Sequence, residues 1–84
     1  MDVDERIRRV LAEHARLAVP GETLGDDDDL YASGMTSHAS VSVMLALEDA
    51  FDVEFPEAML KKSTFGSVRA IRTALTGLAP ALLS

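Results

Sequence analysis

The spacing of the apolar residues is the strongest constraint on the fold, because it is helical in three separate stretches of an 84-residue chain. A stripe in residues 2–17 follows the i, i+3, i+4, i+7 rule and comprises Ile7, Val10, Leu11, His14 and Leu17. A second arc in residues 37–52 comprises Val43, Met44, Leu47, Ala50 and Phe51. A third comprises Phe65, Val68, Ile71 and Leu75. The pattern predicts an all-α fold, a small bundle of three main helices with a long first connection.

Capping residues predict where the helices begin. Asp2 is expected to cap the first helix, with Glu5 three residues on, and Ser37 or Thr36 the second. Residues 56–62 allow one short helical turn with Pro56 at its first position.

The last helix is expected to start at Ser63 or Thr64, with Gly66 in its first turn. Gly77 and Pro80 are expected to end it, and the last few residues to fray. The whole of residues 1–84 is expected to be a single domain.

Residues 18–35 form the long connection and contain four consecutive aspartates. A calcium-binding EF-hand loop needs glycine at position six and glutamate at twelve, whereas counting from Asp26 gives Tyr31 and Ser37. The run is therefore interpreted as a solvated acidic segment, anchored by apolar side chains at Leu24, Leu30, Tyr31 and Met35.

Charge and composition exclude several classes of function. The net charge of −6 repels nucleic acid and anionic lipid and favours basic protein surfaces. The sequence has no cysteine, so any thiol must come from a cofactor. Uncharged runs are too short to span a bilayer and the N-terminus lacks a signal sequence, so a cytoplasmic, monomeric protein without a membrane partner is expected.

Ser37 is the candidate site residue. Gly34 allows a tight turn just before it, and a serine at a helix N-terminus lies where free N–H groups favour a phosphate. Taken alone, such a serine is an ordinary helix cap.

The surrounding motifs resemble those of the acyl and peptidyl carrier proteins over nearly the whole chain. The resemblance is carried by Asp29-Leu30, Gly34-Met35-Thr36-Ser37, Leu45 to Phe51, Phe55-Pro56 and Thr64-Phe65. It implies that Ser37 receives 4′-phosphopantetheine from coenzyme A through a phosphopantetheinyl transferase. It also implies that the arm holds an acyl or aminoacyl group as a thioester, loaded by a ligase and passed to a downstream transferase.

Helix 37–52 also carries the expected docking surface. Val41 and Leu45 fall outside its core arc, among acidic residues, which indicates either burial on two sides or a partner contact. The resemblance aligns both with docking positions, together with Glu48 and Asp49. The expected surface also includes Thr36, His38, Met59 and Leu60.

Two residues depart from the family pattern, since Thr36 and His38 replace the usual Asp and Leu beside the serine. This variant is similar to stand-alone bacterial carriers that amino acid:carrier protein ligases charge. An unmodified helical scaffold remains the alternative. An enzyme with Ser37 as nucleophile is disfavoured, because the sequence lacks the G-x-S-x-G elbow and adjacent His38 points about 100° away along a helix. No catalytic residue and no metal ligand set is expected.

Overall fold

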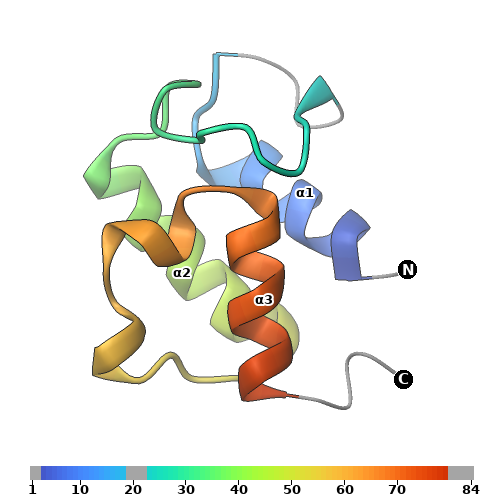
Figure 1. Cartoon of the computed structure of the whole chain (residues 1–84), viewed down its shortest axis with the longest axis vertical. Coiled ribbons are helices and arrows are strands. Elements are labelled where there is room, and N and C mark those ends of the chain that lie inside the picture. The colour runs from blue at the N-terminus through green and yellow to red at the C-terminus, as the bar shows by residue number, and fades with distance from the viewer. Residues whose placement is uncertain (1–2, 19–22, 80–84) are drawn as a thin grey trace.

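The computed structural model describes residues 3–18 and 23–79 as a helical bundle without strands in those ranges (Figure 1). The α-helices are α1 (Val3–His14), α2 (Ser37–Phe51) and α3 (Val68–Leu78). Two short 3₁₀ helices, η2 (Glu57–Met59) and η3 (Lys62–Phe65), connect α2 to α3. The predicted all-α class and long first connection are confirmed.

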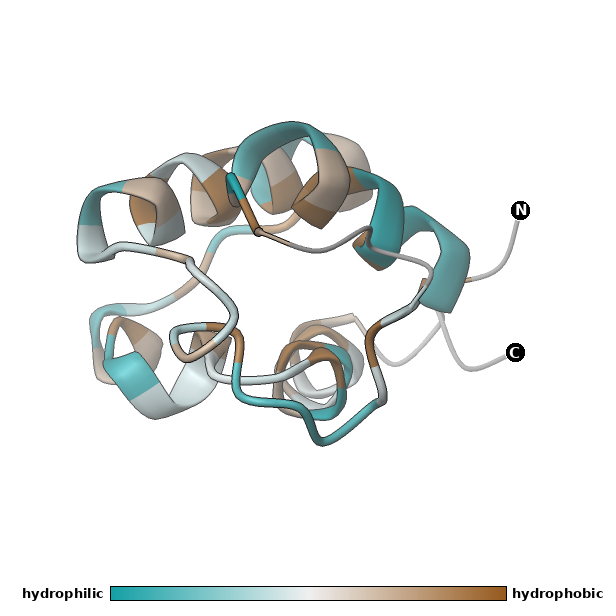
Figure 2. Cartoon of the chain, turned by 90° about the horizontal axis from the view of Figure 1, so that it is seen from above, coloured by the Kyte–Doolittle hydropathy of each residue, from teal (hydrophilic) through white to brown (hydrophobic). Residues whose placement is uncertain are grey.

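The core lies where the helical stripes meet, and Figure 2 shows apolar colouring on the inward sides of the helices. α1 and α2 pack together, α3 packs on α1, and η3 packs against α2 and α3. The fully buried side chains from the three helices are Ile7, Leu11, Val43, Leu47, Val68, Ile71 and Leu75. The first connection contributes Leu24, Leu30 and Met35, which confirms three of its four predicted anchors as buried; Tyr31 is only partly buried.

The first helix is shorter than predicted. α1 ends at His14 rather than at residue 17, and Arg16 adopts a left-handed φ of 55° that a helix cannot accommodate. Leu17 still packs partly against the core from outside the helix, and His14, the last residue of the helix, is half-buried. The proposed cap Asp2 lies outside the described residues.

α3 begins later than predicted, because tertiary hydrogen bonds occupy the backbone before it. The Gly66 carbonyl accepts a hydrogen bond from Leu30 N–H at 2.8 Å, so it is not available to a helix. Ser67 is the cap instead of Ser63 or Thr64, and its hydroxyl accepts from Ala70 N–H at 3.1 Å.

The other helix ends also differ from the predictions. Gly77 lies inside α3, which continues to Leu78, while Pro80 and the expected frayed end lie outside the described residues. α2 stops at Phe51, because Asp52 turns left-handed with φ 53°. The single turn predicted at 56–62 is two 3₁₀ helices, with Pro56 as the cap of η2 rather than its first residue.

An ion network closes the bundle by joining residues from three segments. Arg72 of α3 binds Asp4 of α1 at 2.5 Å and Asp26 of the connection at 3.1 Å. Arg8 of α1 binds Asp26 at 3.0 Å and the Leu24 carbonyl at 2.6 Å. The hydrogen bond from Arg72 is the main cause that lowers the pKa of Asp26, and the hydrogen bond to Asp4 is the main cause that raises the pKa of Arg72.

Within the described ranges, every helix falls short of the length and apolar character needed to cross a bilayer.

Candidate functional site

The four aspartates before the site have structural roles. Asp26 belongs to the ion network, and Asp27 pairs with Arg69 at 2.8 Å. Asp28 accepts a hydrogen bond from Gly25 N–H. Asp27 to Asp29 are exposed, as a solvated segment requires, yet the run also shapes the connection. No cluster of potential metal ligands occurs in the part of the chain that the structure describes.

The last aspartate shapes the turn that leads toward the serine. The Asp29 carboxylate accepts hydrogen bonds from Tyr31 N–H at 3.0 Å and Ala32 N–H at 3.4 Å. These bonds satisfy backbone donors in an irregular segment and hold the start of a tight turn. Tyr31 is thereby fixed beside α2.

Gly34 lets the connection pass close to the end of α1. Its φ is 120°, and a Cβ at this position would lie 3.2 Å from Ala18 N. Ala18 N–H donates to the Ser33 carbonyl at 2.9 Å, and this hydrogen bond holds the two segments together. Met35 N–H then donates to the Leu30 carbonyl, and the Met35 side chain is buried. These contacts fix the point at which α2 begins.

Thr36 caps α2, and this leaves the hydroxyl of Ser37 uncommitted. The Thr36 hydroxyl accepts a hydrogen bond from Ala39 N–H at 3.0 Å. Ser37 is exposed, and within the described residues its hydroxyl has no hydrogen-bond partner, whereas Ser40 Oγ donates to the Ser37 carbonyl. The first amides of a helix have no partner inside it and favour an anion. Ser37 is therefore exposed at a helix N-terminus, a position that favours an anion.

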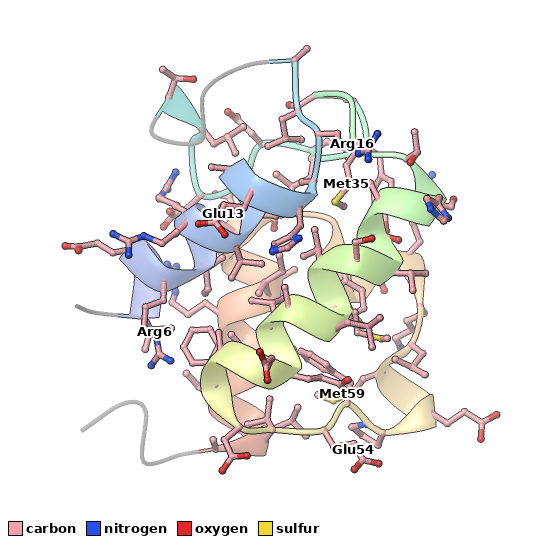
Figure 3. The ribbon with its side chains drawn as sticks, turned by 180° about the vertical axis from the view of Figure 1, so that it is seen from behind. Arg6, Glu13, Arg16, Met35, Glu54 and Met59 are labelled. Carbon is pink, nitrogen blue, oxygen red and sulfur yellow. The ribbon has the colours of Figure 1, made fainter. Side chains whose placement is uncertain are left out.

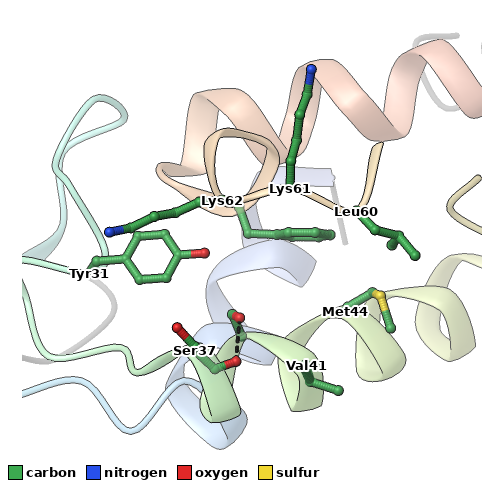
Figure 4. A pocket seen from close by; sticks show the side chains of 9 residues that line it. Tyr31, Ser37, Val41, Met44, Leu60, Lys61 and Lys62 are labelled. Carbon is green, nitrogen blue, oxygen red and sulfur yellow. Dashed lines mark hydrogen bonds between the residues drawn. The ribbon is translucent and has the colours of Figure 1, made fainter. Parts of the chain in front are cut away.

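A groove of about 340 Å³ opens beside Ser37, between the start of α2 and η3 (Figure 4). Its walls include Tyr31, Ser37, Met44, Leu60, Lys62 and Phe65. In Figure 4, Tyr31 and the Lys62 ammonium lie at the same end as Ser37, while Met44 and Leu60 lie at the other. The groove thus has a polar, cationic end next to the serine and an apolar end beyond it.

Sequence reasoning missed the groove, because its far wall comes from η3. The sequence pattern identifies Tyr31 only as an anchor of the connection. Phe65 is held at the base by an edge-to-face contact with Phe55, with ring centroids 5.2 Å apart. The sequence does contain an apolar and basic segment at residues 58–62, just before the last helical stripe, but its spacing does not show where it lies relative to Ser37.

A comparison with protein-family models matches residues 5–75 to the phosphopantetheine attachment site family. The chain is a phosphopantetheine-binding carrier protein. The match covers most of α1, the connection, α2 and most of α3, so it includes Ser37 with the elements that position it. Members of this family carry substrates and are not themselves catalysts.

Similar proteins agree with this assignment. The carrier is 48% identical over 65 residues to an aminoacyl carrier protein of Agrobacterium fabrum, covering 77% of this chain and 78% of the relative. It also matches the structure of an engineered Bradyrhizobium japonicum glycine:[carrier protein] ligase complexed with a carrier protein from Agrobacterium tumefaciens and AMP. That match has a TM-score of 0.86 and 42% identity, and covers 88% of this chain and 99% of the matched one. A solution structure from Agrobacterium tumefaciens matches with a TM-score of 0.70 and 42% identity, covering 88% and 89% of the two chains.

Val41 and Leu45 are exposed, with 51% and 55% of their surface accessible, so burial on two sides does not explain them. They belong to different hollows of the carrier. Val41 lines the groove beside Ser37, whereas Leu45 lines a hollow between α1 and α2 that also includes Arg6 and Arg9. The surface around Leu45 is therefore of mixed charge rather than purely acidic.

Glu48 and Asp49 differ in their surroundings. The Glu48 carboxylate accepts a hydrogen bond from Phe55 N–H at 2.9 Å, and Glu48 is half-buried. Asp49 is exposed on α2 and makes no ion pair within the described residues. Glu48 thus holds the segment after α2, and Asp49 is the acidic group more accessible to a partner.

The remaining docking candidates divide in a similar way. Thr36 and His38 flank Ser37 and are exposed, and Leu60 is 48% accessible. Met59 instead packs partly against the core, at the opposite end of the molecule from Met35 (Figure 3).

The two histidines are not arranged as bases for Ser37. His14 lines the hollow between α1 and α2 beside Leu45, and its imidazole lies 3.9 Å from the Glu13 carboxylate. His38 follows Ser37 on the helix, and no hydrogen bond joins the two side chains in the described ranges.

Proposed function

We propose that Ser37 bears the phosphopantetheine arm and that the protein holds an amino acid as a thioester on it. The observation that carries this proposal is the division of roles at the start of α2, where Thr36 caps the helix and the exposed Ser37 hydroxyl is left uncommitted. The chemistry of the position fits the group, because a phosphodiester on Ser37 Oγ lies beside the free amides of a helix N-terminus.

Modification requires a phosphopantetheinyl transferase and coenzyme A. The Ser37 oxygen forms a bond to the phosphorus that bears pantetheine, and the bond from that phosphorus to the bridging pyrophosphate oxygen breaks. Adenosine 3′,5′-bisphosphate leaves, and the hydroxyl proton is released. The neutral Thr36 places no carboxylate next to the incoming phosphate, so the loading surface differs from that of carriers with Asp at this position.

We infer that an amino acid:carrier protein ligase loads the arm, with glycine as the first cargo to test. Support comes from the aminoacyl carrier relative and from the ligase bound to the carrier in the matched structure. Docking is proposed to use the exposed groups around Ser37 and along α2, namely Thr36, His38, Val41, Leu45, Asp49 and Leu60. Glu48 and Met59 support that surface from partly buried positions.

We further propose that residues 1–84 act as one monomeric carrier domain in the cytoplasm. Coenzyme A and ATP, on which modification and loading draw, support that location. A downstream transferase is then needed to take the amino acid from the thioester, because a carrier does not itself transfer it.

The test of attachment is intact mass spectrometry after incubation with a promiscuous phosphopantetheinyl transferase and coenzyme A. We expect the wild type to gain the mass of one phosphopantetheine, and Ser37→Ala to gain none. Ser40→Ala is the matched control, since it removes a hydroxyl one turn away, and it is expected to be modified normally. An unmodified wild type would instead support the unmodified scaffold.

The cargo is tested by incubating the modified protein with glycine, ATP and a glycine:carrier protein ligase. We expect a further mass gain equal to glycine minus water, which hydroxylamine removes because it cleaves thioesters. Loading by a fatty acyl ligase, and not by the amino acid ligase, would reject the aminoacyl assignment while retaining the attachment site.

A further inference from the structure

The groove beside Ser37 is lined by two positively charged side chains, Lys61 and Lys62. The chain has a net charge of −6 and only two lysines, which are adjacent at Lys61 and Lys62. In Figure 4 the Lys61 side chain extends away from Ser37, whereas Lys62 lies over Tyr31 at the serine end of the groove.

Three of the arginines pair with aspartates of the connection between α1 and α2. Arg8 and Arg72 bind Asp26, and Arg69 binds Asp27. These pairs neutralise the acidic connection and are built into the fold.

Lys62 differs, because it forms no ion pair with a carboxylate in the described ranges. Its ammonium lies 4.8 Å from the centroid of the Tyr31 ring, in a cation–π contact. Lys62 is exposed and Tyr31 is partly buried, so the contact is open to solvent on one side. The ring therefore holds a cation at the groove without neutralising it.

A phosphodiester on Ser37 changes what this cation can bind. The phosphodiester is an anion with strong acceptor oxygens, and an ammonium can donate charge-assisted hydrogen bonds to them, which the face of an aromatic ring does not accept in the same way. Lysine also has a flexible stem that can redirect its charge over a short distance. The position of Lys62 at the serine end of the groove gives it this opportunity.

We propose that Lys62 is the counter-ion of the phosphodiester on Ser37, and that Tyr31 holds its ammonium ready for that role before modification. On modification the ammonium moves from the Tyr31 ring to a phosphate oxygen, and the start of the arm is drawn over the groove. The inference rests on the proposed attachment at Ser37.

The experiment compares apo and modified protein by NMR. In the apo form, we expect the ring current of Tyr31 to shift the methylene protons next to the Lys62 nitrogen upfield, because the ammonium lies 4.8 Å from the ring centroid. We expect them to move downfield on modification, with a matching change in the Tyr31 ring signals. The phosphorus resonance of the modified protein reports the same contact from the phosphate side.

Three variants make the test specific. In modified Lys62→Gln the phosphorus resonance should differ from that of the wild type, whereas Lys61→Gln should match the wild type because that side chain extends away. Lys62→Arg keeps the charge and should restore most of the wild-type shift. Backbone amide spectra check that each variant is folded, as expected for substitutions at an exposed residue.

The failures of the two proposals are distinguishable by mass spectrometry before the NMR is recorded. If no phosphopantetheine is added, the attachment proposal and this inference fail together. If it is added at Ser37 but the Lys62 methylene signals stay in place, and Lys62→Gln shifts phosphorus no more than Lys61→Gln, only the counter-ion role is overturned.

Discussion

At the scale of single residues, the Glu48 carboxylate has a structural role in addition to its charge on the surface of α2. The family resemblance predicts a docking role for it, yet its carboxylate accepts a hydrogen bond from Phe55 N–H, just before Pro56 and η2. The bond fixes the chain on either side of Phe55, whose ring packs against Phe65 beneath the groove. A change at Glu48 therefore reaches the groove through the backbone.

We expect Glu48→Lys to lower the free energy of unfolding by about 1–3 kcal/mol, because the Phe55 amide loses its charged acceptor. Glu48→Gln keeps an acceptor oxygen and should lose less. Asp49→Lys reverses the same charge on an exposed neighbour and should leave stability within about 0.5 kcal/mol.

Urea denaturation measures these differences, and ligase loading of the modified protein measures docking. Asp49→Lys is expected to slow loading without loss of stability. If Glu48→Lys proves as stable as Asp49→Lys, the structural role assigned to the Glu48 carboxylate is wrong.

At the scale of elements, the connection between α1 and α2 determines where Ser37 stands. Its path depends on Gly34, where a side chain would require an unfavourable positive φ and would meet Ala18 N at 3.2 Å. We expect Gly34→Ala to destabilise the protein by about 1–3 kcal/mol.

Gly77→Ala is the matched control for that substitution. Gly77 lies in α3 with nothing near its missing Cβ, so alanine should stabilise the helix by about 0.5–1 kcal/mol. The two urea midpoints should thus move in opposite directions. A midpoint for Gly34→Ala at or above the wild type would show that the turn tolerates a side chain.

Elements that depend on local interactions could be predicted from the sequence, and those that depend on tertiary contacts could not. The stripes of α1, α2 and α3 depend on local periodicity, and the sequence predicts them well. The start of α3 does not depend on local periodicity alone. The hydrogen bonds from Leu30 N–H to the Gly66 carbonyl and from Arg69 N–H to the Asp26 carbonyl form only when the connection packs against the segment before α3. Ser63, Thr64 and Ser67 were equivalent caps by type, and those tertiary bonds select Ser67.

The candidate site was predictable to a similar extent. Ser37 could be identified from motif and position, since both are local. The Lys62–Tyr31 contact and the Glu48–Phe55 hydrogen bond could not, because each depends on how the chain after α2 folds back.

At the scale of the whole molecule, Asp26 joins the two outer helices through Arg8 and Arg72. The arginine hydrogen bonds lower its folded pKa, so its contribution to stability is present above the unfolded value of about 3.9. That contribution is lost as pH falls through the lowered folded pKa. The raised pKa of Arg72 leaves its charge intact throughout this range.

We therefore expect Asp26→Asn to be less stable than the wild type at neutral pH, with the gap closing as pH falls below about 4. Unfolding free energies of both proteins between pH 7 and the acid limit of folding measure the gap. Asp49→Asn, which removes an equal charge outside the network, controls for net charge. A gap that stays constant into the acid range would contradict the network's role.

The ion network has a consequence for engineering. Its members belong to α1, the connection and α3, and none of them lies on α2. The outward-facing residues of α2 can therefore be substituted to bind a different enzyme, while the ion network between α1 and α3 stays intact, provided that Glu48 is kept. In such a variant, the choice of partner could be changed through α2 while the rest of the fold stays the same.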